Sequence, residues 1–443
     1  MSDEMRVRRP ARLRGTIAIP GDKSVTHRAI MFNSIAAGDA RIDGFLDAAD
    51  TRSTLECMRA LGAEIEDLGG GVLVVHGRGR GGLHEADNVL DCGNSGTTMR
   101  LLTGLVSGLP MLSVLTGDDS LRRRPMARVV RPLAQLGAEI TARAAGTLPP
   151  VVVQGGPLRG GQRVDTAVAS AQVKSALLLA GLAADGPTTV SEPSASRDHT
   201  ERMLAAMGAG IATVEDGGRH VVTLTPPATD LVAVDVTVPG DISTAAVWMV
   251  LASLHPDAEL TLMNVGINPT RTGLLDILWG MGADITLIEE RVTGGEPVAD
   301  LRVRSARLKG IEVGGELVPR AIDELPLVAL AGALAEGETL IRDAEELRVK
   351  ESDRVASTAA VLRAFGAEVE ERPDGMLVRG GATLHAGSAE SRGDHRLAML
   401  GAAAGVLADG VSTIVGGGAV VVSYPEFWEE LLRLQAAEGA VSR

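Results

Sequence analysis

Six short polar segments of the chain carry the residue types that bind anions and move protons. Four of them carry Lys or Arg beside Gly, Ser or Asp at expected helix starts: 20–28, 120–125, 348–354 and 393–396. The other two, 92–98 and 169–174, offer hydroxyls, amides and free N–H groups. Helix N-termini attract anions through free amides and the macrodipole, and Arg adds a fork that matches phosphate and carboxylate. So many such segments in one chain indicate a cleft for ligands with several negative groups.

Each segment by itself also has a purely structural interpretation. These alternatives are solvated helix starts for Lys23 and Arg28, surface charge for Arg122 and Arg123, and helix caps for Asp323 and Glu324. The histidines and cysteines show no ligand spacing such as His-x-x-x-His or Cys-x-x-Cys, so we expect no metal. The glycine-rich run 77–82 formally matches a dinucleotide fingerprint, but without a βαβ context we expect a turn there.

The elements that position these segments are repeated. Apolar, alanine-rich helices that we expect to be buried on most faces are predicted at 23–37, 95–107, 170–184, 242–254, 324–335 and 395–408. Five further helices end in a similar motif, in which an apolar residue precedes Gly-Ala at Gly62, Gly137, Gly208, Gly282 and Gly366. A glycine there predicts a left-handed cap followed by a strand. A sixth, degraded copy is expected at 428–439.

Short β-branched runs between the helices predict strands, including 72–75, 151–153, 221–224, 234–238 and 420–422. The period exceeds 70 residues, whereas solenoid units have about 20–50. A chain of 443 residues also exceeds what one core usually supports. We therefore predict two α/β domains, each with about three compact units.

Composition narrows the class of protein. The net charge of −14 and 2% aromatic content argue against a nucleic-acid partner. No signal peptide or long apolar run is apparent, and two cysteines fit a reducing compartment. We expect a cytoplasmic protein that is not inserted in a membrane.

Five motifs, read together and in order, resemble the EPSP synthase family over essentially the whole chain. They are Pro-Gly-Asp-Lys-Ser at 20–24 with Arg28, Gly-Asn-Ser-Gly-Thr at 93–97 with Arg100, Ser-Ala-Gln at 170–172, Arg-Val-Lys-Glu-Ser-Asp-Arg at 348–354 and Asp-His-Arg at 394–396. The resemblance implies transfer of the enolpyruvyl group of phosphoenolpyruvate to shikimate 3-phosphate, a step of aromatic amino-acid biosynthesis. It also implies a monomer that needs no cofactor or metal.

The resemblance implies the two-domain α/β (α+β) enolpyruvyl transferase fold, with six βαβαββ units, three per domain. Residues 1–20 and 239–443 would form one domain and 21–238 the inserted one. The same Pro-Gly-Asp tripeptide occurs at both crossings, near 20–22 and 238–241, and suits hinges that close the domains on substrate.

The implied reaction needs proton donors and acceptors beside cations. Lys23, Asp323 and Glu351 match the catalytic positions of the family. Lys23 and Glu351 would exchange protons with the enolpyruvyl carbon and bridging oxygen, while Asp323 would face the attacking hydroxyl. Which residue makes which transfer is left open by the sequence.

Both substrate sites follow from the resemblance position by position. Shikimate 3-phosphate would contact Lys23, Ser24, Arg28, Ser170, Ala171, Gln172, Arg197, Asp323 and Lys350. Phosphoenolpyruvate would contact Lys23, Gly96, Arg124, Gln172, Arg354 and Arg396.

Three departures mark a divergent branch of the family. Val422 stands where many members have Lys, Leu101 where many have Pro, and Arg197 lies in a Ser-Arg-Asp-His variant of its motif. They leave glyphosate sensitivity open, although Gly96 leaves room for that inhibitor. Two alternatives remain: UDP-N-acetylglucosamine enolpyruvyl transferase, whose reactive Cys is missing from residues 117–125, and a non-enzymatic repeat scaffold.

Overall fold

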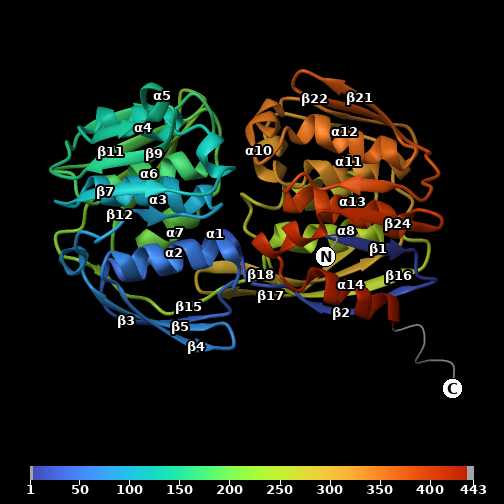
Figure 1. Ribbon diagram of the computed structural model, residues 1–443, viewed down its shortest axis with the longest axis horizontal. Coiled ribbons are helices and arrows are strands. Elements are labelled where there is room, and N and C mark those ends of the chain that lie inside the picture. Colours follow the sequence, from blue (N-terminus) through green and yellow to red (C-terminus); the bar gives the residue numbers. More distant parts are fainter. Residues whose placement is uncertain (1–2, 437–443) are drawn as a thin grey trace. The chain divides into compact units, whose positions relative to one another are not determined.

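The computed structural model describes residues 3–436, which belong to two compact units (Figure 1). Unit 1 comprises Met1–Pro20, Pro239–Val292 and Glu296–Arg443, and unit 2 comprises Gly21–Val238 with Thr293–Gly295. The chain therefore passes from one unit to the other directly after Pro20 and again after Val238.

Unit 2 contains three sheets of the same design. In each, a short first strand pairs in parallel with a second strand, and two antiparallel strands complete the sheet. The strand orders are β14 (Leu231–Val232) and β15 (Val236–Thr237), β3 (Ala36–Asp43), β5 (Val72–Arg78), β4 (Glu64–Gly69); β6 (Leu90–Asp91), β7 (Leu112–Thr116), β9 (Leu148–Gln154), β8 (Glu139–Ala142); and β10 (Gln162–Asp165), β11 (Thr188–Glu192), β13 (Arg219–Thr225), β12 (Gly210–Asp216).

Unit 1 repeats this design twice in full and once in part. Its strand orders are β2 (Leu13–Ala18), β16 (Ala258–Gly266), β18 (Glu296–Arg304), β17 (Asp284–Thr293); β19 (Glu312–Val313), β20 (Glu338–Ile341), β22 (Gly375–Arg379), β21 (Glu368–Arg372); and β23 (Ser388–Glu390), β24 (Val411–Val415), β1 (Glu4–Arg8). The six predicted βαβαββ units are thus recognisable, and the mixed α/β fold class is confirmed.

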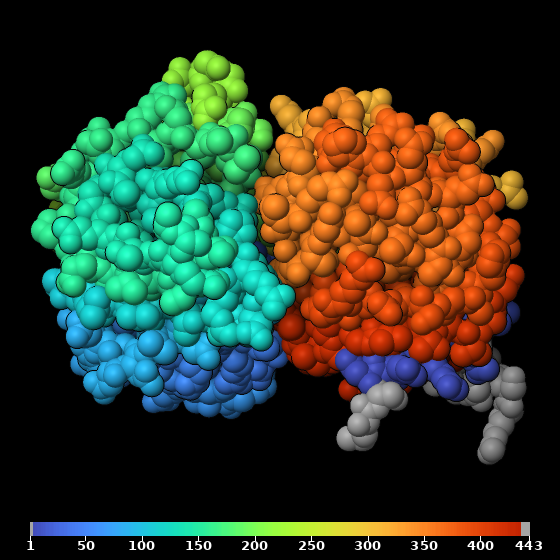
Figure 2. Space-filling model, turned by 45° about the horizontal axis from the view of Figure 1, so that its top comes forward, coloured from blue at the N-terminus to red at the C-terminus, as the bar shows by residue number. Residues whose placement is uncertain are grey.

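The last repeat is completed by the other end of the chain. Its sheet takes β1 as an antiparallel neighbour of β24, from Glu4 opposite Val415 to Arg8 opposite Val411. In Figure 2 the blue N-terminal residues accordingly lie against the red C-terminal part of unit 1. The helix α14 (Phe427–Ala436) matches the predicted degraded copy, whose residues 437–439 lie outside the described residues.

Two helices connect the strands of each repeat. In unit 2 they are α1 (Lys23–Ser34) and α2 (Ala49–Ala60), α3 (Gly96–Ser107) and α4 (Ala127–Gln135), and α6 (Ala171–Gly181) and α7 (His199–Ala206). In unit 1 they are α8 (Ile242–Leu254) and α9 (Gly273–Met281), α11 (Leu325–Leu334) and α12 (Arg354–Ala364), and α13 (His395–Leu407) and α14. The short helices α5 (Arg143–Gly146) and α10 (Leu317–Ala321) lie in connections.

The first helix of each repeat is buried, as predicted from its apolar composition. In α3 every residue except Thr97 is buried, and in α13 every residue except Arg396. Small residues allow these helices to pack closely, because a Cβ on Gly104 of α3 would lie 2.1 Å from the carbonyl oxygen of Ala176 in α6. Each buried helix can therefore present polar groups to a ligand only at its end.

The repeated helix endings also have the predicted conformation. Gly62, Gly137, Gly208, Gly282 and Gly366 all have φ between 90° and 97°, in the left-handed region that favours glycine. The glycine-rich run 77–82 forms a turn, as predicted. The strand β5 ends at Arg78, and a 3₁₀ turn, η1 (Arg80–Gly82), follows it.

Two local predictions were wrong. Residues 420–422 form the end of a 3₁₀ helix, η4 (Gly417–Val422), instead of a strand, because the sheet position beside β24 is taken by β1. The helix α1 ends at Ser34, and Ala36 and Ala37 belong to the strand β3. Within residues 3–436, no helix is long and apolar enough to cross a membrane.

Candidate active site

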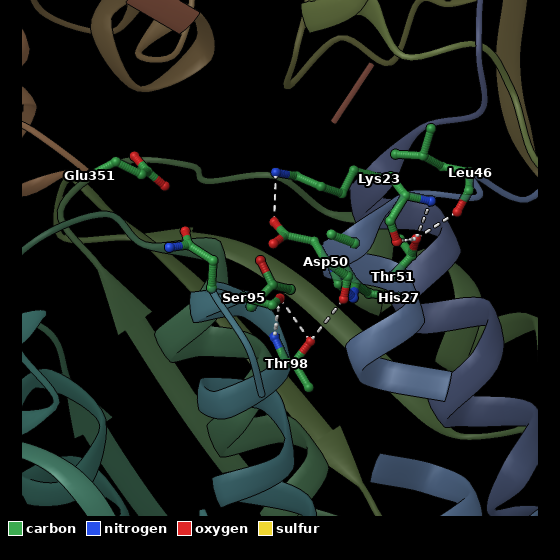
Figure 3. A network of polar contacts seen from close by, with 12 residues as sticks. Lys23, His27, Leu46, Asp50, Thr51, Ser95, Thr98 and Glu351 are labelled. Carbon is green, nitrogen blue, oxygen red and sulfur yellow. Dashed lines mark hydrogen bonds and ion pairs between the residues drawn. The ribbon is translucent and has the colours of Figure 1, made fainter. Parts of the chain in front are cut away.

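The predicted residues of unit 2 gather where four helices begin. Lys23 opens α1, and its Nζ lies 3.0 Å from Oδ2 of Asp50 in the first turn of α2. The hydroxyl oxygen of Thr98 in α3 lies 3.4 Å from the backbone oxygen of Asp50. Figure 3 shows Lys23 pointing toward Asp50, with Ser95 and Thr98 nearby. We call the predicted residues of this unit, together with Asp50, the unit 2 set.

A chain of hydrogen bonds fixes these helix ends against one another. Nδ1 of His27 lies 2.6 Å from the Thr54 hydroxyl, which lies 2.6 Å from the Thr98 hydroxyl. Thr98 in turn donates to Ser95, the N-cap of α3. Burial, with the charges of Lys23 and Arg28, holds the pKa of His27 well below its ordinary value. The histidine is therefore neutral and structural.

We expect His27 to make the protein less stable in weak acid. Its folded-state pKa lies below the unfolded value of about 6.5, so below that pH the unfolded chain binds a proton that the folded protein does not. Stability should be complete above pH 6.5 and fall by up to about 1.4 kcal/mol per pH unit below it. Urea unfolding between pH 5 and 7.5 should show this slope, and His27→Asn should flatten it. His76→Asn is the control, because Asp39 raises the pKa of that partly exposed histidine and its removal cannot flatten the slope. An unchanged slope in His27→Asn would contradict the assignment.

Arg28 ties three helices of unit 2 together. Its Nε donates to the Thr200 hydroxyl at 2.7 Å, its Nη2 to the Ser175 hydroxyl at 2.8 Å and its Nη1 to the Ser24 carbonyl at 2.9 Å. The side chain is buried, with 2% of the residue exposed. It is thus a fixed buried cation at the start of α1, and the solvated-surface alternative for Arg28 is excluded.

The starts of α3 and α6 are joined through Gln172. Its Oε1 accepts from Nη1 of Arg100, and its Nε2 donates to the Thr97 hydroxyl at 2.9 Å. Gly96 begins α3 beside Arg100, and a Cβ there would lie 2.7 Å from Nη1 of Arg100 and 3.5 Å from Nη1 of Arg124. The missing side chain therefore keeps space free beside two guanidinium groups.

Arg124 is held by residues that the sequence motifs did not assign to the site. Its Nη2 donates to Oδ1 of Asn94 at 2.5 Å and to the Ser120 hydroxyl at 3.3 Å. The amide nitrogen of Asn94 donates to Asp118 at 2.6 Å. Arg124 is buried whereas Arg123 is exposed.

The start of α6 carries Ser170 and Ala171. Ser170 is the N-cap residue, but its side chain does not cap the helix. Its backbone N–H donates instead to Oε1 of Glu192 at 2.7 Å. Arg197 lies in the segment between β11 and α7 and is half-buried.

Two predicted carboxylates of unit 1 contact the guanidinium of Arg354, and we call all predicted residues of this unit the unit 1 set. Nη1 of Arg354 lies 3.1 Å from Oδ1 of Asp323, and Nη2 lies 2.6 Å from Oε2 of Glu351. Nε donates to Oδ2 of Asp394 at 2.8 Å. Only 1% of Arg354 is exposed. Both predicted carboxylates thus share one buried cation, and neither acts as a side-chain cap in this arrangement.

Asp394 anchors this cluster. Burial acts to raise the pKa of Asp394, but the Arg354 charge outweighs it and holds the pKa below its ordinary value. Asp394 also caps α13 by accepting from the Arg396 N–H at 3.0 Å. Nη2 of Arg396 lies 3.5 Å from Oδ2 of Asp323, and Nη1 lies 3.8 Å from buried Glu324.

Lys350 and Glu351 lie in the segment that precedes α12. Nζ of Lys350 lies 3.3 Å from Oε1 of Glu346, and both side chains are partly exposed. Asp353 caps α12 and pairs with Arg348 at 2.8 Å. The carboxylates here enclose a guanidinium, and among residues 3–436 no group of His, Cys, Asp or Glu is arranged to hold a metal ion.

In unit 1 the structure joins Asp323, Glu351 and Arg396 to the cluster around Arg354, whereas Lys350 pairs with Glu346 instead. It also shows three contacting residues that the motifs did not assign to the site. Asp50, Asn94 and Glu192 touch Lys23, Arg124 and Ser170 respectively. Asp50 and Glu192 lie in no recognisable motif, so only their contacts reveal them. Asn94 lies within the motif at 93–97. Its amide side chain in that motif was the signal that could have indicated its contact with Arg124.

Comparison with known proteins identifies the family of the chain. The family model described as EPSP synthase (3-phosphoshikimate 1-carboxyvinyltransferase) matches residues 7–431. A 3-phosphoshikimate 1-carboxyvinyltransferase from Roseiflexus sp. (strain RS-1) is 54% identical over 428 residues, which cover 96% of this chain and 98% of the relative. The solved EPSP synthase from Acinetobacter baumannii is 43% identical, with a TM-score of 0.85 over 97% of this chain and 98% of that one. The enolpyruvyl transferase NikO from Streptomyces tendae is 20% identical, with a TM-score of 0.78 over 98% of both chains, and shares the fold. The chain therefore belongs to the EPSP synthase family.

Proposed function

We propose that the unit 2 set and the unit 1 set act on the same two substrates, shikimate 3-phosphate and phosphoenolpyruvate. The family carries out enolpyruvyl transfer in the shikimate pathway of aromatic amino-acid biosynthesis. The observation that carries the residue assignment is the clustering around Arg354, which holds both Asp323 and Glu351 next to Arg396. The family match over residues 7–431 favours this acceptor over UDP-N-acetylglucosamine and over a scaffold without activity.

The transfer takes place by addition and then elimination. In the addition, the 5-hydroxyl oxygen of shikimate 3-phosphate bonds to C2 of phosphoenolpyruvate, the hydroxyl loses its proton and C3 gains one. In the elimination, C3 of the tetrahedral intermediate loses a proton and the C2–O bond to phosphate breaks. The products are enolpyruvylshikimate 3-phosphate and phosphate. Lys23, Asp323 and Glu351 supply the proton transfers in our proposal.

The unit 1 set places two carboxylates beside one buried guanidinium. Asp323 and Glu351 both contact Arg354, which also donates to Asp394. In our proposal Glu351 or Asp323 delivers the proton to C3, because both lie beside the guanidinium that is assigned to the donor.

Binding of shikimate 3-phosphate is assigned to polar and charged residues that lie mainly at helix starts. The residues are Lys23, Ser24, Arg28, Ser170, Ala171, Gln172, Arg197, Asp323 and Lys350. The non-capping hydroxyl of Ser170 and the free amides at the start of α6 suit the phosphate. Phosphoenolpyruvate is assigned to Lys23, Gly96, Arg124, Gln172, Arg354 and Arg396, where buried guanidinium groups match its phosphate and carboxylate.

Three further points belong to the same proposal. The chain crossings near 20–22 and 238–241 serve as hinges, and residues 1–20 with 239–443, and 21–238, are the two domains. The protein acts as a monomer in the cytoplasm. Its reaction requires no metal or other cofactor.

Phosphate release tests the function. We expect the protein to release phosphate from phosphoenolpyruvate only when shikimate 3-phosphate is present, and to do so equally well in EDTA. Release without the ester, or loss of release in EDTA, would contradict the proposed transfer. No release with either shikimate 3-phosphate or UDP-N-acetylglucosamine would favour the scaffold alternative.

Val422→Lys tests the departure near the C-terminus. Val422 is the last residue of η4 and is half-buried. We expect a lysine there to restore one cation for the donor and to lower the KM for phosphoenolpyruvate about threefold or more, as a charge-assisted contact would. Val421→Lys, at an exposed neighbouring position, is the control. An unchanged KM in Val422→Lys would show that this position does not face the donor.

Gly96→Ala tests glyphosate as an inhibitor of the donor site. The new methyl group needs only the flexible end of Arg100 to move, so the protein should fold normally. The methyl narrows the space beside Arg124, so we expect the inhibition constant for glyphosate to rise more than the KM for phosphoenolpyruvate. Steady-state inhibition of wild type and variant measures both constants. An unchanged inhibition constant would place glyphosate elsewhere.

A further inference from the structure

A buried ion cluster lies directly behind the start of α6. Lys174 is fully buried, and its Nζ lies 3.1 Å from Oε2 of Glu192 and 2.7 Å from Oε1 of Glu201. Burial acts to lower the pKa of Lys174, but Glu201 and Glu192 outweigh it and raise the pKa. None of these three residues belongs to the catalytic or binding sets assigned above.

Glu192 links the cluster to two separate segments. Oε1 accepts from the backbone N–H of Ser170 at 2.7 Å, and Oε2 accepts from the hydroxyl of Ser196 at 2.7 Å. Lys174 reinforces the second link, because its Nζ donates to the Ser196 carbonyl at 3.2 Å. One carboxylate at the end of β11 therefore fixes both the first residue before α6 and the residue before Arg197.

A buried charge cluster of this kind is weak evidence for stability. Apolar residues of similar volume often stabilise a protein as well as a buried ion pair or better. What apolar residues cannot do is accept one hydrogen bond from Ser170 and another from Ser196 at the same time. The cluster therefore explains how the segments that carry Ser170 and Ser196 are held in position.

We propose that Glu192, held by Lys174, is a positioning residue that sets the spacing of Ser170 and Arg197 for shikimate 3-phosphate. This inference rests on the proposed function, because Ser170 and Arg197 are assigned there to that substrate. Glu192 orients the Ser170 backbone and leaves the hydroxyl of Ser170 free for the ligand. Glu201 contributes only by balancing the charge of Lys174.

A pair of matched variants tests the proposal. Glu192→Gln and Glu201→Gln each remove one buried negative charge that faces Lys174, but only Glu192 touches Ser170 and Ser196. Binding of shikimate 3-phosphate is measured by isothermal titration, and KM, kcat and the melting temperature are measured alongside it.

We expect Glu192→Gln to weaken shikimate 3-phosphate about tenfold in Kd and KM, with kcat changed less than threefold. Glu201→Gln should lower the melting temperature by a similar amount and leave the Kd for shikimate 3-phosphate unchanged. Equal effects of both variants on Kd, or no effect of Glu192→Gln, would overturn the proposal.

Ser196→Ala keeps the test decisive if Glu192→Gln fails to fold. It deletes one hydroxyl donor to Glu192 but removes no buried charge, and it should raise the Kd about threefold. No rise would again overturn the positioning role. The wild-type protein separates this outcome from failure of the proposed function, because wild type that binds no shikimate 3-phosphate refutes the function itself.

Discussion

Lys23→Met is expected to lower the rate of phosphate release roughly a thousandfold, within the range found when an acid–base group is removed. The ammonium group at the start of α1 is the one lysine of the unit 2 set that pairs with a carboxylate of that set, Asp50. Methionine keeps the length of the side chain but can neither hold the donor phosphate nor move a proton. The measurement is phosphate release at saturating concentrations of both substrates.

Lys309→Met is the matched control for this experiment. Lys309 is exposed and lies outside both residue sets, so its loss should leave activity and stability unchanged. Lys23→Met leaves Asp50 without its lysine, and we expect a loss of about 1 kcal/mol of stability from the partly buried pair. A Lys23→Met protein that folds and keeps a tenth of the wild-type rate would exclude an acid–base role for Lys23.

Arg354→Met is expected to have the largest effect on stability. Asp394 is fully buried and would lose its cation, which typically costs about 3–5 kcal/mol. Asp323 and Glu351 would lose their shared partner as well, so transfer should fall below detection. Urea unfolding and phosphate release measure the two effects.

The double variant Arg354→Met with Asp394→Asn separates folding from chemistry. Asparagine can still cap α13, as Asp394 does through the Arg396 N–H, but needs no cation. We expect the double variant to recover about half of the lost stability and none of the activity. Arg363→Met, on the same helix, removes an ion pair with Glu371 and the hydrogen bonds to the Val369 carbonyl, and should cost about 1–2 kcal/mol with full activity. Recovery of activity in the double variant would show that Arg354 is only structural.

Local patterns along the chain determine much of this protein. The repeated Gly62-like endings predicted left-handed caps, and all five have them. The apolar helices predicted burial, and α3, α8, α11 and α13 are buried almost completely. Helix periodicity and glycine caps depend on residues a few positions apart, so the sequence reports them directly. The motifs that carry the family resemblance are also local, because each lies within a few residues of a helix start. The family match agrees with that resemblance.

Long-range strand pairing was decided only by the tertiary structure. The first strands of two repeats are separated from their helices by the chain crossings, because β2 pairs with β16 and β14 with β3. The strand β1 similarly completes the last sheet by pairing with β24. Residues 420–422, which were predicted to be a strand beside it, belong to a 3₁₀ helix instead. Such partners lie hundreds of residues apart, and no spacing pattern along the chain encodes which edge a strand will occupy.

The same distinction applies to the side chains that support the candidate site. The motifs included Lys23, Glu351 and Arg354, because these residue types commonly transfer protons or bind anions. They did not name Asp50 beside Lys23 or Glu192 behind Ser170, because an isolated carboxylate is ordinary in sequence. By itself the sequence determined the family, the repeats and the chemical groups. Only the tertiary structure decided which buried carboxylates hold those groups in place, since such contacts depend on distances between elements that are remote along the chain.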